Sequence, residues 1–190
     1  MNKLILLVVI LVGGFFILNS YIYNEKQAPA AADYKNAEYV IEGERIRLVD
    51  GFAESVIDDG PGMDVSVTTR VFGNELVTDL DGDGTEDVAF IVTQERGGSG
   101  TFFYAVAALN SERGYVGSDG YLLGDRIAPQ TTNVSPNPRH KYVVVFNYAD
   151  RAPGEPMTAR PSMGKSAYLK IVPETRQWAI VEPDFEGESR

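Results

Sequence analysis

The sequence predicts an all-β protein, with a single compact sandwich or barrel-like domain behind an N-terminal transmembrane helix. Three observations support this prediction. The chain opens with an uncharged apolar run, and the rest consists of short β-type runs separated by turn residues. Outside the opening run, no segment has a convincing apolar stripe at helical spacing. The 158 residues from 33 to 190 are enough for one domain with a core.

The N-terminus has the pattern of a membrane anchor. Residues 4–18 contain no polar side chain, and the first charge after Lys3 is Glu25. The twenty residues 4–23 match the roughly 20 that a helix needs to cross a bilayer. We therefore expect residues 1–23 to be a single-pass signal-anchor in the cytoplasmic membrane, with Lys3 on the cytoplasmic side and the C-terminal domain on the extracytoplasmic side.

Two further segments complete the predicted organisation. Residues 24–37 are polar and rich in Ala and Pro, which is typical of a flexible tether, and residues 38–186 form the extracytoplasmic β domain. The small residues 28–32 leave a cleaved signal peptide as the alternative, although they lie far beyond the apolar run. In both interpretations the domain is exported.

Ten segments have the composition of β-strands. They are Glu38–Ile41, Arg45–Leu48, Ala53–Ile57, Val65–Phe72, Val88–Thr93, Thr101–Leu109, Tyr121–Leu123, Lys141–Tyr148, Ala167–Val172 and Gln177–Val181.

Three of these runs, residues 88–92, 102–109 and 143–146, are apolar on both faces. Such strands must be covered on both sides, so we place them at the centre of the fold. The glycine-rich residues 97–100 predict a hairpin between the first two. A helix within residues 99–109 is the alternative, because Ala and Leu favour helices. The turn-rich segments 129–139 and 150–165 are expected to be long loops.

Composition excludes several classes of function. The formal net charge is −10, which argues against a nucleic-acid partner, because binding to phosphate requires clustered Lys and Arg. The chain has no cysteine and one histidine, His140. Disulfides, thiolate metal sites, cysteine nucleophiles and multi-histidine metal sites are therefore excluded.

The segment Asp79–Asp87 (DLDGDGTED) predicts a calcium site. It places carboxylates at positions 1, 3, 5 and 9 and a glycine at position 6. Ca²⁺ prefers six to eight oxygen ligands, and alternating aspartates in a tight loop supply several of them. The segment is not an EF-hand, because position 12 is Phe90 instead of Glu and the loop runs into a strand.

The loop resembles the strand–loop–strand calcium site of integrin-type FG-GAP repeats. The resemblance implies a ligand set for structural Ca²⁺, which consists of Asp79, Asp81, Asp83, the Thr85 carbonyl and Asp87. Propellers of this type need many repeats and this chain has one copy, so the resemblance concerns the loop alone. An acidic hairpin turn without an ion is the alternative, although four carboxylates in nine residues repel one another.

Further segments resemble a family of small bacterial envelope proteins without assigned biochemistry. They are residues 41–43, 72–75, 87–90, 97–102, 123–131 and 147–151. The resemblance covers roughly residues 39 to 171 and implies a bacterial, extracytoplasmic location. It supplies no catalytic residue.

No pattern assembles a catalytic site. Gly97–Thr101 lacks the last glycine of an esterase Ser motif around Ser99, and His140 is the only imidazole available as a base. The pairs Asp125–Arg126 and Asp150–Arg151 are interpreted as ion pairs that pin loops. Residues 99–104 loosely resemble the Ser-Gly…Tyr loop of bacterial lysozyme inhibitors, but the aromatic residues Phe102, Phe103 and Tyr104 are expected to belong to the core.

The sequence therefore favours a membrane-anchored, extracytoplasmic, calcium-binding domain that acts as a binding or interaction module of the bacterial cell envelope, rather than an enzyme. The expected partners are the membrane, through residues 4–23, and an envelope protein or glycan. An envelope hydrolase with an acidic active site and a lysozyme-inhibitor-like protein are the alternatives.

Overall fold

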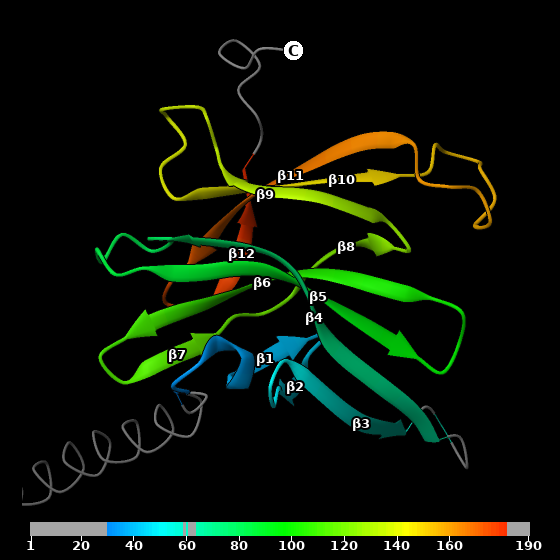
Figure 1. Cartoon of the computed structure of the whole chain (residues 1–190), viewed down its shortest axis with the longest axis horizontal. Coiled ribbons are helices and arrows are strands. Elements are labelled where there is room, and N and C mark those ends of the chain that lie inside the picture. The colour runs from blue at the N-terminus through cyan, green and yellow to red at the C-terminus, as the bar shows by residue number, and fades with distance from the viewer. Residues whose placement is uncertain (1–29, 59, 61–63, 182–190) are drawn as a thin grey trace, which may run out of the picture.

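The structure is a computed structural model that describes residues 30–58, 60 and 64–181. Within these residues it contains one turn of 3-10 helix and twelve strands, which pair in antiparallel sheets (Figure 1). The all-β prediction is confirmed. The predicted anchor, residues 1–23, lies outside the described residues. In the part of the chain that is described, no helix is long and apolar enough to cross a membrane.

The strands are β1 (Glu38–Ile41), β2 (Glu44–Arg47), β3 (Phe52–Asp58), β4 (Asp64–Thr78), β5 (Asp87–Arg96), β6 (Thr101–Ser111), β7 (Gly114–Gly117), β8 (Tyr121–Asp125), β9 (Ala128–Val134), β10 (Val143–Asp150), β11 (Met163–Val172) and β12 (Gln177–Ile180).

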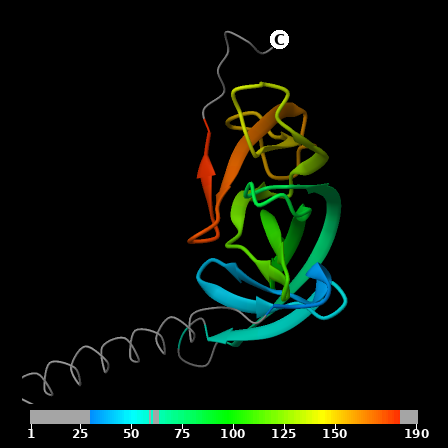
Figure 2. The same cartoon turned by 90° about the vertical axis from the view of Figure 1, so that its left-hand side faces the viewer.

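A six-stranded sheet forms the middle of the molecule. Its order is β3-β4-β5-β6-β7, and β8 also pairs with β6. A four-stranded sheet, β12-β11-β10-β9, lies on one side of it, and the β1-β2 hairpin with the N-terminal segment lies on the other. Figure 2 shows these three parts stacked one above another.

Strands β5 and β6 occupy the centre, as their composition predicts. Alternate residues point to opposite faces of a strand, so Ala89 and Ile91 pack towards the four-stranded sheet while Val88, Phe90 and Val92 pack towards the β1-β2 hairpin. All five side chains are buried. A continuous apolar run is thus explained by a sheet that is covered on both faces.

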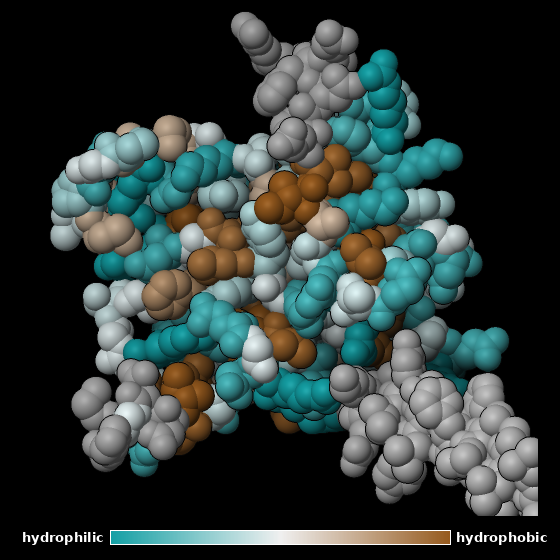
Figure 3. All heavy atoms as spheres, turned by 180° about the vertical axis from the view of Figure 1, so that it is seen from behind, coloured by the Kyte–Doolittle hydropathy of each residue, from teal (hydrophilic) through white to brown (hydrophobic). Residues whose placement is uncertain are grey.

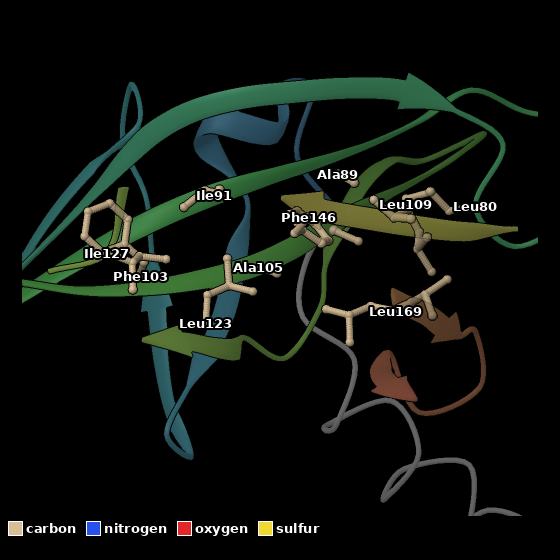
Figure 4. Packing of buried hydrophobic residues seen from close by; sticks show 13 residues of the cluster. Leu80, Ala89, Ile91, Phe103, Ala105, Leu109, Leu123, Ile127, Phe146 and Leu169 are labelled. Atoms are coloured by element: carbon tan, nitrogen blue, oxygen red, sulfur yellow. The ribbon is translucent and has the colours of Figure 1, made fainter. Parts of the chain in front are cut away.

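The first core cluster fills the space between the two larger sheets (Figure 4). Phe146 and Leu169 of the four-stranded sheet meet Ala105 and Ile91 of the six-stranded sheet in this cluster. Leu80 is 1% exposed and joins the cluster at one end, next to Leu109. The residue that follows Asp79 is therefore a core residue.

The hairpin prediction is confirmed, because β5 and β6 pair from Val88 with Ala108 to Glu95 with Thr101. The helix considered for residues 99–109 is absent, since these residues lie in and just before β6. The loop predicted over residues 150–165 is confirmed in its central part, because β10 ends at Asp150 and β11 begins at Met163.

Two strands were not predicted. Ala128–Val134, part of which was expected to be loop, is β9, and Gly114–Gly117 is β7. β9 forms a strand despite Pro129 because it is the edge strand of its sheet, where a missing backbone N–H is tolerated. Strand β4 also runs six residues beyond the predicted end at Phe72, through irregular pairing around Gly73.

The end of the predicted tether belongs to the folded domain. Ala31 pairs with Tyr115 of β7 through two backbone hydrogen bonds of 2.7 and 2.8 Å, and both Ala31 and Ala37 are buried. Tyr34 packs edge-on against Phe90, with ring centroids 5.1 Å apart. The tether interpretation is therefore wrong for residues 31–37. Alanine is common in flexible linkers, but its small side chain also allows the backbone to lie close against a sheet.

Candidate metal centre

The acidic loop Asp79–Glu86 connects β4 to β5, which are antiparallel neighbours. The last residue of β4, Thr78, pairs with Asp87, the first residue of β5. The predicted strand–loop–strand context is therefore confirmed, and Phe90 is a fully buried strand residue as the argument against an EF-hand requires. Two glycines, Gly82 with φ 89° and Gly84 with φ 86°, supply the left-handed turns.

The aspartate side chains hold the loop by accepting backbone hydrogen bonds. Asp79 accepts the N–H of Gly82 at 2.6 Å and that of Gly84 at 3.2 Å. Asp81 accepts the N–H of Asp83 at 3.1 Å, and Asp83 accepts that of Thr85 at 2.6 Å. Short polar side chains that bond to the backbone two or three residues ahead fix such turns.

Asp87 is the buried member of the group. Its side chain is fully buried, and it accepts the N–H of Leu80 at 2.9 Å and that of Asn110 at 2.7 Å. The Asn110 side chain also donates to the Glu86 carbonyl at 3.3 Å. Asp87 thereby ties the beginning and the end of the loop to β6.

Three carboxylates converge. One oxygen each from Asp79, Asp81 and Asp87 lie within 4.8 Å of one another. Oxygens bound to one Ca²⁺ at about 2.3–2.6 Å are at most about 5 Å apart, so this spacing fits a shared cation. Asp83 is not a member of this group, and its carboxylate lies on the exposed side of the loop, bonded to Thr85.

The electrostatics of the group favour a positive charge. Burial raises the pKa of Asp87 to about 6, and this effect exceeds the lowering by the N–H groups of Asn110 and Leu80. The charges of Asp81 and Asp83 raise that pKa further. The pKa of Asp81 is also raised, first by burial and then by the neighbouring charges of Asp83 and Asp79. A bound cation would offset both the burial and the repulsion.

Sequence reasoning did not identify two residues that support the loop. Asn110 lies 23 positions from Asp87, and only the pairing of β5 with β6 brings them together. The ring of Tyr142 lies so close to Gly82 that a Cβ there would be 3.1 Å from two ring carbons. No sequence pattern signals either contact.

A small pocket opens beside the loop. Its volume is about 190 Å³, and its lining consists of Thr78, Asp79, Leu80, Val134, Tyr142, Val143 and Val144. Val134 is 47% and Tyr142 39% exposed, so apolar surface lies beside Asp79. The pocket thus combines a mainly apolar lining with one acidic residue, Asp79.

His140 is part of a local turn. Its Nδ1 lies 2.9 Å from the Ser135 hydroxyl oxygen, which also accepts the N–H of Asn137 at 3.3 Å. Its ring packs edge-on against Tyr168 of β11. This arrangement covers the outer face of the four-stranded sheet, and the Ser residue beside His140 is Ser135 rather than Ser99.

The ion-pair prediction is confirmed for Asp125 and Arg126, which pair at 2.9 Å, and Asp125 also accepts the N–H of Thr101 at 3.0 Å. The Asp150 carboxylate instead pairs with Lys165 at 2.7 Å and accepts only the backbone N–H of Arg151. The Arg151 side chain pins loops by donating to the carbonyls of Ala159 at 2.8 Å and Arg126 at 3.1 Å. Hydrogen bonds to main-chain carbonyls across loops are what a structural arginine makes.

The aromatic run after Ser99 lies in or near the core, as expected. Tyr104 is 1% and Phe103 is 7% exposed. The Tyr104 hydroxyl donates to Glu42 at 2.5 Å, and Glu42 in turn pairs with Arg96 at 2.6 Å. Tyr104 therefore fastens the β1-β2 hairpin to the central sheet.

Comparison of the chain with models of protein families, with curated proteins and with solved structures finds no match.

Proposed function

We propose that this protein is a calcium-binding interaction module of the bacterial cell envelope, held at the cytoplasmic membrane through residues 4–23 with its β domain on the extracytoplasmic side. The observation that carries the proposal is the convergence of three carboxylates, one of them fully buried, on a single point of the β4–β5 loop. Burying like charges together costs free energy unless a cation compensates them.

In this proposal Asp79, Asp81 and Asp87 bind the ion, and Asp83 with the Thr85 carbonyl completes the ligand set. The loop lacks the bidentate Glu of an EF-hand, so water or a partner's oxygen fills the remaining positions of Ca²⁺. The ion is structural, because it crosslinks the loop to β6 through Asp87 and holds Leu80 in the core.

The interaction role is supported by the pocket beside this loop. Its apolar lining and exposed Tyr142 suit a side chain or sugar ring of a partner, and calcium fixes the wall formed by Asp79. The uncharged run at residues 4–23 supports the membrane location and the acidic composition agrees with a partner other than nucleic acid.

The test is a melting curve of the full-length protein in chelator, in 1 mM calcium and in 1 mM magnesium. Extracellular modules bind calcium with a Kd of about 10⁻⁴–10⁻³ M, so 1 mM calcium adds about 0.4–1.4 kcal/mol of stability. The expected rise in Tm is about 1–6 °C. Magnesium should act weakly, because it demands a tighter octahedron and keeps its water.

Three variants sharpen this test. Asp81→Asn removes one converging ligand and should abolish the calcium response, and Asp83→Ala should weaken it. Glu86→Gln is the matched control, because Glu86 is exposed in the same loop and loses the same charge. Identical wild-type curves in all three solutions would mean that the loop is an acidic turn without an ion.

The interaction role is tested with the same proteins as bait in bacterial envelope extract, with calcium and with chelator. A partner retained by wild type and by Glu86→Gln in calcium, and lost in chelator and by Asp81→Asn, is the expected result. A partner set that is the same for all baits and both solutions would contradict a calcium-dependent module.

A further inference from the structure

The outer edge of β3 has the geometry to pair with another strand. β3 is the last strand of the six-stranded sheet, and the described residues place no further strand beside it. The β3–β4 hairpin projects from the lower right of the molecule in Figure 1. An edge strand of this kind presents unpaired backbone N–H and C=O groups.

The hydrogen bonds at the start of β3 fix which residues face outwards. Gly51 accepts the N–H of Val71 on β4 at 2.8 Å, whereas Phe52 bonds to Val49 on the opposite side through bonds of 2.8 and 3.1 Å. Directions alternate along an antiparallel strand, and β3 pairs with β4 without a register shift. The backbone groups of Glu54 and Val56 therefore point away from the sheet.

The side chains at this edge are also accessible. Val56 is 67% exposed, and Glu54 is exposed on the same face of the strand. A β-branched residue beside an open backbone edge is favourable for cross-strand pairing. Figure 3 shows that apolar residues on the rear face of the molecule form separate patches among polar ones.

The charge of this region selects the partner. Between Arg47 and Arg70 the sequence contains five acidic residues and no Lys, Arg or His. A second copy of this chain would bring like charges together across the new pair, which disfavours self-association. A cationic strand would bring opposite charges together at Glu54.

The other sheet edges are less suited to this partner. β7 is covered by the Ala31–Tyr115 pairing. β9 carries Pro129, which has no N–H, and no charged residue lies between Asp125–Arg126 and Arg139. Among the edges of β3, β7 and β9, that of β3 combines outward backbone groups with an exposed acidic side chain, Glu54.

We propose that β3 binds an extended, lysine- or arginine-rich segment of a partner protein by strand addition, with Glu54 and Val56 as the pairing positions. This surface lies at the start of β4, whereas the acidic loop follows the end of β4. The inference rests on the interaction role proposed above but not on the calcium site. If calcium does not stabilise the protein, the peptide-binding experiment can still be interpreted. If the peptides do not bind, the calcium experiment can likewise still be interpreted.

The test uses three labelled, end-capped peptides and the full-length protein in nonionic detergent. The first is Thr-Lys-Val-Lys-Val-Lys-Thr, the second has Glu in place of Lys, and the third is the Lys peptide with an N-methyl group on the backbone nitrogen of all seven residues. Methylation keeps the charge and removes the backbone N–H groups from both edges of the peptide. Fluorescence anisotropy in 50 and 200 mM salt reports the affinities.

We expect the Lys peptide to bind at least about tenfold more tightly than either other peptide, because lost hydrogen bonds and reversed charge each weaken pairing. Val56→Pro removes an outward N–H and should reduce binding about tenfold, and Val56→Thr is its matched control. Glu54→Lys should also weaken binding, and melting curves establish that each variant is folded.

Three results would overturn the proposal. One is equal binding of the methylated and unmethylated Lys peptides, which would show attraction by charge alone. The second is equal binding of the Lys and Glu peptides. The third is an affinity for the Lys peptide that is the same in folded Val56→Pro as in Val56→Thr, or the absence of Lys-peptide binding in both variants.

Discussion

The buried carboxyl of Asp87 gives the ion-free protein a specific dependence of stability on pH. Its pKa is raised to about 6 in the folded state by burial, whereas an unfolded Asp titrates near 3.9. Between these values the folded state binds more protons than the unfolded state, so the free energy of unfolding falls as pH rises. The stabilisation by this proton is present below about pH 4 and is lost as pH rises through 6.

The magnitude follows from the shift of about two pKa units. At about 1.4 kcal/mol per unit, the loss between pH 4 and pH 7 is about 3 kcal/mol. Asp150, whose pKa is lowered by Lys165, acts in the opposite sense, but its effect falls below about pH 4. The window from pH 4 to 7 is therefore governed by the acidic loop.

The measurement is urea unfolding of the full-length protein in chelator at pH 4, 5, 6 and 7, for wild type, Asp87→Asn and Asp83→Asn. Asp87→Asn should lose most of the slope, because only the raised pKa of Asp81 remains. At pH 4 it should be less stable by about 1–3 kcal/mol, because an amide NH₂ replaces one of the two oxygens that face the N–H groups of Leu80 and Asn110. Asp83→Asn should keep most of the slope, because the charge of Asp83 is the smallest of the causes that raise the pKa of Asp87. A flat wild-type profile, or the same slope in Asp87→Asn, would refute the argument.

Two further predictions concern packing. Gly117→Ala would place a Cβ 2.2 Å from the Glu38 carbonyl oxygen, so thermal unfolding should show a loss of about 2–3 kcal/mol, whereas Gly164→Ala, with open space around it, should change stability by less than about 0.5 kcal/mol. Trp178→Phe removes the indole N–H that donates to the Ala105 carbonyl at 3.1 Å between the two larger sheets and should cost about 1–2 kcal/mol in urea unfolding. Ile180→Val, on the same strand and 67% exposed, is the control and should be nearly neutral.

The sequence was sufficient for the fold class and for the central strands because their signal is local. Runs such as residues 88–92 are apolar at every position, and only a sheet covered on both faces buries them all. The hairpin turn at residues 97–100 is equally local. These features depend on neighbours in the chain.

The missed elements depend on distant residues. β7 is four residues long with glycine at both ends, and it forms because Gly117 fits beneath Glu38 and Ala31 pairs with Tyr115. β9 has few apolar residues, and its partners are on β10. Neither the periodicity nor the composition of these segments contains that information.

In the candidate site too, the sequence predicts what depends on neighbouring residues and misses what depends on distant ones. The predicted ligands were Asp79, Asp81, Asp83, the Thr85 carbonyl and Asp87. The fold brings the carboxylates of Asp79, Asp81 and Asp87 together, because the loop between two paired strands is short, and it leaves Asp83 outside this group. The role of Asn110 and the approach of Tyr142 to Gly82 arise from strand pairing and sheet packing. Sequence spacing identifies carboxylates within one loop but not the residues that bury them.

The two ends of β4 are both acidic, but our proposals assign them different partners. At its end, three carboxylates are folded onto one point and one is fully buried, so the favourable partner is a compact cation. At its start, the acidic residues are spread along a hairpin whose neighbouring edge is open, so the favourable partner is an extended chain with its own spaced charges. Both ends carry negative charge, and in our two proposals the arrangement of the backbone determines whether an ion or a strand neutralises it.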